Sequence, residues 1–166
     1  MKRAGLILML CAGLLVAGCG DDSGDESTST STATSAESAE KPQLGTKPEV
    51  TVPEGPAPKQ LVEKDLVVGD GAAAKAGDEV TVQYVGVGYE SGEEFDASWD
   101  RGEPFTFPLG AGEVIKGWDQ GVVGMKEGGR RELIIPPSLA YGPAGSPPVI
   151  GPNETLVFVV DLVSVN

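Results

Sequence analysis

The stretch Glu113-Val114-Ile115-Lys116-Gly117-Trp118-Asp119 decides the fold expected for this chain of 166 residues. It combines a tryptophan and two β-branched residues with a glycine, a composition that weakens an isolated helix. Four apolar residues nevertheless share one helical face, at positions i, i+1, i+4 and i+8: Val114, Ile115, Trp118 and Val122. We therefore predict one short helix over residues 114–123, with the Trp118 indole at the floor of an apolar cavity. An isolated tryptophan is more often an ordinary core residue, so the flanking sequence has to decide between the two interpretations.

The flanking sequence has the pattern of strands separated by turn residues. Short apolar or alternating runs predict strands at residues 61–68, 80–85, 105–107, 132–135 and 155–165. The last run is apolar on both faces, which suits a central strand. We predict an α+β domain over residues 61–166, in which a sheet wraps around the single helix.

Residues 1–18 have the form of a bacterial secretion signal. Lys2 and Arg3 precede an apolar run of 11 residues, 6–16, which is too short to span a bilayer. Small residues then lead to Cys19, and this order resembles the lipobox of bacterial lipoproteins, whose mature chain begins at a lipid-carrying cysteine. We expect the lipid on Cys19 to anchor the chain at the extracytoplasmic face of the bacterial cell membrane, at the cell surface or in the periplasm. The alternative is a secreted protein with a free cysteine.

Residues 19–60 are predicted to form a disordered acidic tether rich in Ser, Thr and Pro. Hardly any large apolar residue occurs there, so the segment cannot build a core of its own. Its acidic residues indicate solvated charges rather than a calcium site, because nothing in the segment imposes a ligand geometry.

The composition of the chain excludes several classes of function. The absence of histidine removes Ser-His-Asp and Cys-His catalysis and most transition-metal sites. The net charge is −13, so we expect no nucleic-acid partner and no electrostatic attraction to an anionic membrane. We also expect no metal and no cofactor, and the charge favours a monomer.

Several short motifs occur in a fixed order along the domain. They are Val82-Gln83-Tyr84-Val85-Gly86, Glu94-Phe95-Asp96-Ala97-Ser98, Pro104-Phe105-Thr106-Phe107, residues 112–118, Gly128-Gly129-Arg130-Arg131, Leu139-Ala140-Tyr141-Gly142 and Thr155-Leu156-Val157-Phe158. Their order and spacing resemble those of the FKBP-type peptidyl-prolyl cis–trans isomerases, the immunophilins that bind tacrolimus and rapamycin. The resemblance implies a twisted antiparallel sheet wrapped around one short α-helix, with the active site between the helix and the sheet.

The resemblance also implies which residues form the site. The catalytic residues would be Phe95, Asp96, Tyr141 and Phe158, and the substrate-binding residues would be Tyr84, Phe105, Val114, Ile115, Trp118, Val149 and Ile150. Trp118 would be the floor, while Val149 and Ile150 would lie on a flap loop. The Tyr141 hydroxyl and the Ile115 backbone N–H would donate hydrogen bonds to substrate carbonyls.

Two of these assignments depend on the resemblance more than on the residues. Taken alone, Asp96 is typical of an ordinary turn or cap aspartate. The resemblance places it at the pocket wall instead, with its charge compensated by Tyr84 and Arg101. Phe105 and Phe107 are expected on opposite faces of their strand, and the resemblance selects Phe105 as the pocket residue.

The expected function is peptidyl-prolyl cis–trans isomerisation of proteins that fold outside the cytoplasmic membrane. The partners would be proline-containing polypeptides, with tacrolimus or rapamycin as further ligands. The alternative is a chaperone or scaffold module that binds proline segments, with incidental isomerase activity. An acidic solute-binding or metal-binding lipoprotein fits residues 1–19 but not the motifs.

Overall fold

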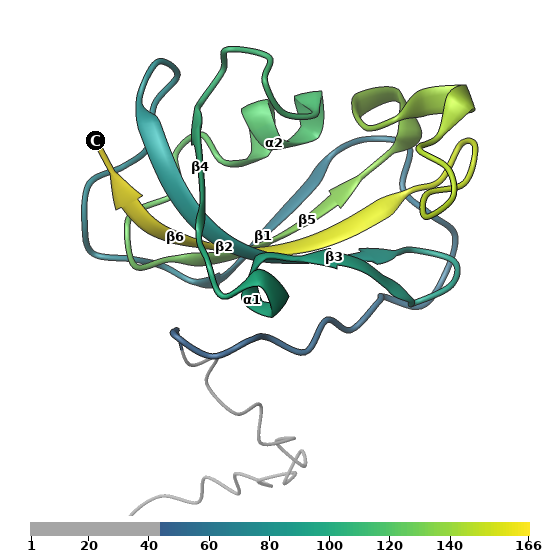
Figure 1. The fold of residues 1–166 in the computed structure, drawn as a ribbon, viewed down its shortest axis with the longest axis horizontal. Coiled ribbons are helices and arrows are strands. Elements are labelled where there is room, and N and C mark those ends of the chain that lie inside the picture. Colours follow the sequence, from purple (N-terminus) through teal and green to yellow (C-terminus); the bar gives the residue numbers. More distant parts are fainter. Residues whose placement is uncertain (1–43) are drawn as a thin grey trace, which may run out of the picture. The chain divides into compact units, whose positions relative to one another are not determined.

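The structure, a computed structural model, describes residues 44–166. Six antiparallel strands form its sheet: β1 Val62–Val67, β2 Glu79–Gly88, β3 Glu94–Ala97, β4 Phe105–Pro108, β5 Arg130–Ile135 and β6 Leu156–Val165. The order across the sheet is β1-β5-β6-β2-β3, and β4 pairs with the first half of β2, beside β3. The strand β6 is therefore central, as its two apolar faces predict, and the α+β class is confirmed (Figure 1).

The helices are α1 Ser98–Arg101 and α2 Lys116–Gly121, and two 3₁₀ turns follow at Pro137–Leu139 and Gly142–Ala144. The helix α2 begins later than predicted because Ile115 has an extended backbone, with φ −60° and ψ 147°. The Ile115 carbonyl accepts hydrogen bonds from the N–H groups of Trp118 at 2.9 Å and Asp119 at 3.2 Å. Val114 and Ile115 therefore precede the helix and do not lie on its face. Neither β3 nor α1 is among the predicted elements.

Two glycines allow α2 to lie directly against the sheet. A Cβ atom at Gly117 would lie 2.3 Å from Cγ2 of Ile135, and one at Gly121 would lie 2.6 Å from Cδ2 of Leu133. Both contact residues belong to β5. The glycines that weaken this helix in isolation are thus required by its packing.

The face of the sheet toward α2 carries the main core. Side chains alternate along each strand, so β6 presents Leu156, Phe158 and Val160 to this face, and β5 presents Leu133 and Ile135. Each of these residues is at most 5% exposed. The aromatic residues of this core pack around Trp118 of α2, which is in ring contact with Tyr84, Phe107 and Phe158.

The opposite face of the sheet carries a second apolar cluster that includes Val85, Val87, Ile134 and Val157. Residues 44–60, hereafter the N-terminal strap, run along this face (Figure 1). Within the strap, Val50, Val52 and Ala57 are half-buried against the cluster. The prediction of a disordered tether is therefore wrong for residues 44–60, because the outer face of the sheet supplies the apolar surface that this segment lacks. Residues 19–43, with Cys19, and the signal segment 1–18 lie outside the described residues.

Candidate active site

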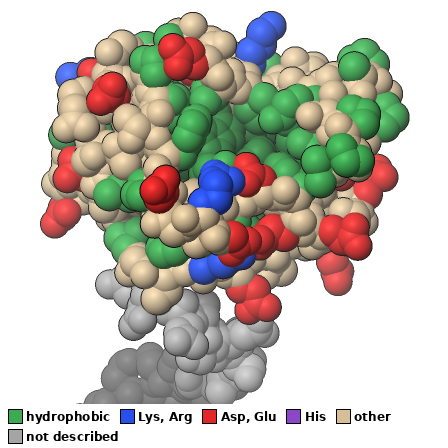
Figure 2. All heavy atoms as spheres, viewed as in Figure 1, with side chains coloured by type: hydrophobic (Ala, Val, Ile, Leu, Met, Phe, Trp, Pro, Cys, Tyr) green, Lys and Arg blue, Asp and Glu red, His purple; other side chains and the backbone are tan. Residues whose placement is uncertain are grey.

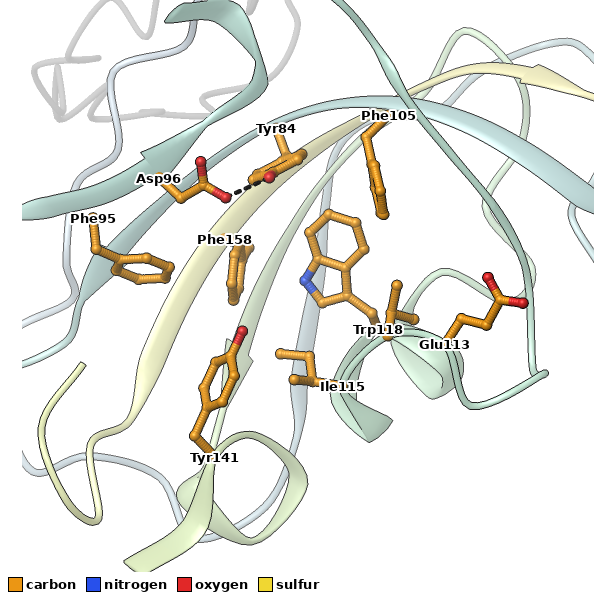
Figure 3. A pocket seen from close by; sticks show the side chains of 10 residues that line it. Tyr84, Phe95, Asp96, Phe105, Glu113, Ile115, Trp118, Tyr141 and Phe158 are labelled. Atoms are coloured by element: carbon orange, nitrogen blue, oxygen red, sulfur yellow. Dashed lines mark hydrogen bonds between the residues drawn. The ribbon is translucent and has the colours of Figure 1, made fainter. Parts of the chain in front are cut away.

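A pocket of about 390 Å³ lies between the inner face of the sheet and the chain around α2. Figure 2 shows this face of the molecule, where hydrophobic side chains line a hollow with charged side chains along its rim. The lining residues come from β2, β3, β4, the segment before α2, α2 itself, the turns after β5, and β6 (Figure 3). They are Tyr84, Phe95, Asp96, Phe105, Glu113, Val114, Ile115, Trp118, Tyr141 and Phe158.

Trp118 forms the floor, as predicted, and its side chain is 4% exposed. Its ring packs edge to face with Tyr84 at 5.0 Å and with Phe158 at 5.3 Å between ring centroids. Its Nε1 has no hydrogen-bond partner within residues 44–166. Figure 3 shows the nitrogen-bearing edge of the indole on the side of Phe158, whose ring plane lies at 86° to that of the indole. The floor of the pocket is therefore formed by packed aromatic rings.

The polar wall of the pocket is a network of Asp96, Tyr84 and Arg101. The Tyr84 hydroxyl donates to Oδ2 of Asp96 at 2.5 Å, and Arg101 donates to Oδ1 of the same carboxylate. A second guanidinium nitrogen of Arg101 donates to Tyr84 Oη at 2.7 Å. The structure confirms the predicted compensation of Asp96 by these two residues. Burial, together with the hydrogen bond to Asp96, raises the pKa of Tyr84, so its hydroxyl remains a donor across the physiological range.

Ser98 holds this wall against β2. It is fully buried at the start of α1, and its Oγ accepts a hydrogen bond from the Tyr84 backbone N–H at 2.8 Å. The Ser98 hydroxyl also donates to the Gln83 side chain. Sequence reasoning missed this contact, because a single serine after a short strand carries no pattern.

Phe105 lines the pocket, whereas Phe107 is buried behind it at 2% exposure. The expectation that the two rings lie on opposite faces is wrong. Residues i and i+2 of a strand share a face, and the two rings stack with centroids 5.4 Å apart. Both contact Trp118, at 6.3 Å for Phe105 and 5.6 Å for Phe107. Their position along the strand, not its face, decides which ring reaches the pocket.

Two hydrogen-bond donors in the pocket wall are available to a ligand. The Ile115 N–H has no hydrogen-bond partner in the described part of the chain, because Ile115 precedes the first helical turn. The Tyr141 hydroxyl is likewise without a partner among residues 44–166, and Figure 3 shows it pointing into the pocket. These are the two groups that the family resemblance implies as donors to substrate carbonyls.

Two predicted residues do not line the pocket. Ile150 is 5% exposed and belongs to the main core, and Val149 is 61% exposed. A bridge between Ser146 and Ile150, with mutual hydrogen bonds of 2.9 and 3.0 Å, turns the Ile150 side chain inward. Conversely, Glu113 lines the pocket although it is not among the predicted site residues. Its place directly before Val114 and Ile115 is the signal that could have identified it.

Trp99, the other tryptophan, does not belong to the site. It packs against the outer apolar cluster, on the same side of the sheet as the strap. It therefore anchors the loop after Asp96 rather than binding a ligand at the pocket.

No group of three or more potential metal-ligating side chains occurs among the residues that the structure describes. The helices within residues 44–166 are all too short or too polar to cross a membrane.

Comparisons with known proteins extend this description. The family model described as FKBP-type peptidyl-prolyl cis-trans isomerase matches residues 71–163. An FK506-binding protein of Streptomyces anulatus is 62% identical over 120 residues, which cover 72% of this chain and 97% of that protein. A probable FK506-binding protein of Corynebacterium glutamicum is 56% identical over 119 residues, covering 71% of this chain and 98% of that protein. The crystal structure of AtFKBP13 superposes with a TM-score of 0.60 at 42% identity, covering 65% of this chain and 94% of that one.

Fold and pocket together define a small α+β domain with an apolar pocket between its helix α2 and its sheet. The family model and the two relatives identify the family of this domain: the chain belongs to the FKBP-type peptidyl-prolyl cis–trans isomerases. The family binds proline-containing peptides and FK506-type ligands. The alignment with the Streptomyces protein is longer than residues 61–166 can accommodate, so it also includes residues before position 61.

Proposed function

We propose that this isomerase accelerates rotation about X–Pro bonds in proteins that fold outside the bacterial cytoplasmic membrane. The observation that carries the proposal is the pocket itself, an aromatic cavity whose wall holds two hydrogen-bond donors without a partner among residues 44–166. The X–Pro bond rotates in tens to hundreds of seconds without a catalyst, which is slow enough to limit folding. A pocket that receives the proline ring acts directly on that step.

The apolar lining favours the twisted amide over the planar one. Resonance separates charge in the planar amide and creates a barrier of about 18–20 kcal/mol. The twisted amide has lost this resonance and is less polar, so transfer into an apolar cavity penalises the planar form more. A reduction of the barrier by about 4–7 kcal/mol corresponds to roughly 10³–10⁵-fold acceleration. No proton has to move, which is consistent with a chain that contains no histidine.

The polar groups then orient the substrate. The Ile115 N–H and the Tyr141 hydroxyl donate to peptide carbonyls on either side of the proline, and the Asp96 network fixes the Tyr84 ring at the wall. Removal of one donor leaves the apolar cavity intact. Tyr141→Phe is therefore expected to reduce kcat/KM while the unfolding transition stays where it is.

The proposed location rests on residues 2–19. A basic start, a short apolar run, small residues and Cys19 follow one another in the order of a lipoprotein signal. We place the lipid on Cys19 and the isomerase domain on the extracytoplasmic side of the membrane. Mass spectrometry of the mature N-terminus tests this: a diacylglycerol-modified Cys19 is expected, and an unmodified Cys19 or a different start contradicts it.

A chaperone or scaffold module with the same pocket is the alternative function, and tacrolimus is a ligand that both functions share. The two functions can be distinguished by measuring both the binding and the rate of cis–trans isomerisation of the same Xaa-Pro peptide. The isomerase predicts acceleration that tacrolimus abolishes at one equivalent. Tacrolimus binding and peptide binding without acceleration would favour the module instead.

A further inference from the structure

The N-terminal strap contacts the pocket wall from the back of the sheet. Lys47 Nζ lies 2.8 Å from Oε1 of Glu94 and 2.7 Å from Oδ1 of Asp100. Glu94 is the first residue of β3 and Asp100 lies in α1. One lysine thus joins the two ends of the segment that carries Phe95 and Asp96.

This segment has few other restraints. The strand β3 is four residues long and lies at an edge of the sheet, where it pairs only with β2. The pairing has three registered residue pairs and an irregularity between Gly86 and Val87. The helix α1 that follows is a single turn. The contact of Lys47 with Glu94 and Asp100 is therefore an important restraint on the position of the segment that carries Phe95 and Asp96.

The strap is itself held in place, which gives Lys47 a fixed origin. Val50 and Val52 pack against the outer apolar cluster. The carbonyl of Thr46 accepts a hydrogen bond of 3.0 Å from Arg130, whose side chain is buried in an ion pair with Asp161. The chain on both sides of Lys47 is thus anchored to the sheet.

The charges favour the same arrangement. Without Lys47, the carboxylates of Glu94 in β3 and Asp100 in α1 would lie close together in a chain of net charge −13. The hydrogen bonds to Asp100 and Glu94 raise the pKa of Lys47, and the hydrogen bond from Lys47 lowers the pKa of Asp100. The hydrogen bonds thus favour the charged forms of Lys47 and Asp100.

We propose that Lys47 is a positioning residue of the isomerase, which fixes the β3–α1 segment with Phe95, Asp96 and Arg101 from the outer face of the sheet. This inference rests on the proposed role of the pocket in turnover. It also assigns the strap to the functional domain, which then begins before residue 61.

The test compares Lys47→Met, Lys47→Arg and Lys59→Met in the full chain. Lys59 is an exposed lysine of the same strap with no partner among the described residues, so it controls for loss of charge. We expect Lys47→Met to lower kcat/KM by about three- to tenfold, the range that two exposed ion pairs support. Lys47→Arg should stay within about twofold of the wild type, because arginine can also bridge two carboxylates. Raising the salt to about 1 M should reduce the difference between the wild type and Lys47→Met.

Two further measurements test whether Lys47→Met acts by displacing the β3–α1 segment. They distinguish this effect from a general loss of stability and from the case in which the pocket has no isomerase activity. In an Asp96→Ala background, Lys47→Met should lower kcat/KM by a smaller factor than in the wild type, because one of the residues that it positions has been removed. Amide hydrogen exchange should rise severalfold at residues 94–101 in Lys47→Met but not in Lys59→Met, and this measurement needs no turnover. Unchanged exchange, equal effects of the two methionine variants, or full additivity with Asp96→Ala would each overturn the proposal.

Discussion

Phe158→Leu separates the role of the pocket in turnover from its role in folding. Phe158 is 5% exposed, and its ring centroid lies 5.3 Å from Trp118, 5.5 Å from Phe95 and 6.2 Å from Tyr84. Each aromatic pair contributes about 0.5–1.5 kcal/mol beyond its buried area, while leucine retains most of the volume. We expect the free energy of unfolding to fall by about 2–3 kcal/mol. A domain of this size is stable by about 5–15 kcal/mol, so the variant stays folded.

The same substitution removes an aromatic wall from the pocket. We expect kcat/KM for an Xaa-Pro peptide to fall about tenfold, equivalent to about 1.4 kcal/mol of transition-state stabilisation. Phe107→Leu is the matched control, because Phe107 is 2% exposed in the same core and contacts Phe105 and Trp118 without lining the pocket. It should lose about 1–3 kcal/mol of stability and keep kcat/KM within about twofold. Urea unfolding and peptide isomerisation measure the two effects, and equal losses of turnover in both variants would refute the pocket assignment.

Three further predictions concern the wall and the helix. Because the raised pKa of Tyr84 means that its proton is held more tightly in the native state, its stabilising contribution is complete below about pH 10 and is lost above it. The difference in unfolding free energy between the wild type and Tyr84→Phe should stay constant up to about pH 9 and shrink above about pH 10. A difference that stays constant above about pH 10 would contradict this. Gly117→Ala should lower the free energy of unfolding by about 1–3 kcal/mol although alanine has the better helix propensity, because the Cβ atom would lie 2.3 Å from Ile135. A higher urea midpoint for the variant would show that α2 does not lie so close to β5. Asp96→Ala should lower the free energy of unfolding by at most about 1 kcal/mol, because the half-exposed ion pair between Asp96 and Arg101 is screened by solvent. The same variant should reduce kcat/KM about tenfold. Unchanged turnover would show that Asp96 is not part of the site.

The sequence predicts the strands whose apolar residues form a clear periodic pattern along the chain. The alternating run in β2 and the doubly apolar run in β6 are visible because side-chain periodicity reports burial directly. The strand β3 is too short to show a period, and its residues Phe95 and Asp96 are both half-buried, so they do not alternate between a buried and an exposed face. The start of α2 depends on the extended backbone at Ile115, which no composition rule identifies.

The strap is ordered against the outer face of the sheet although its composition predicts disorder. Its prolines and charges are typical of a disordered segment, and it has too few apolar residues for a core of its own. The outer face of the sheet, however, presents Val85, Val87 and Val157, which need a cover. Val50 and Val52 provide it, and this pairing is visible only when both segments are considered together.

The motifs place Trp118 and Ile115 at the pocket, although they do not predict the extended backbone of Ile115. The site was not predictable on the loop that follows the second 3₁₀ turn. There the Ser146–Ile150 bridge decides which side chain turns inward, and it buries Ile150 while leaving Val149 in solvent. Loop geometry of this kind depends on hydrogen bonds that single residues do not signal.

The central claim is that an apolar pocket accelerates X–Pro rotation without moving a proton. The most direct measurement is the rate of cis–trans exchange in an Xaa-Pro peptide, followed by NMR between about pH 6 and 9 in water and in heavy water. With no histidine in the chain and the pKa of Tyr84 raised, the account predicts roughly 10³–10⁵-fold acceleration, flat across this range and without a solvent isotope effect. No acceleration by the folded chain, or a rate that follows the titration of a group in this range with a clear isotope effect, would contradict it.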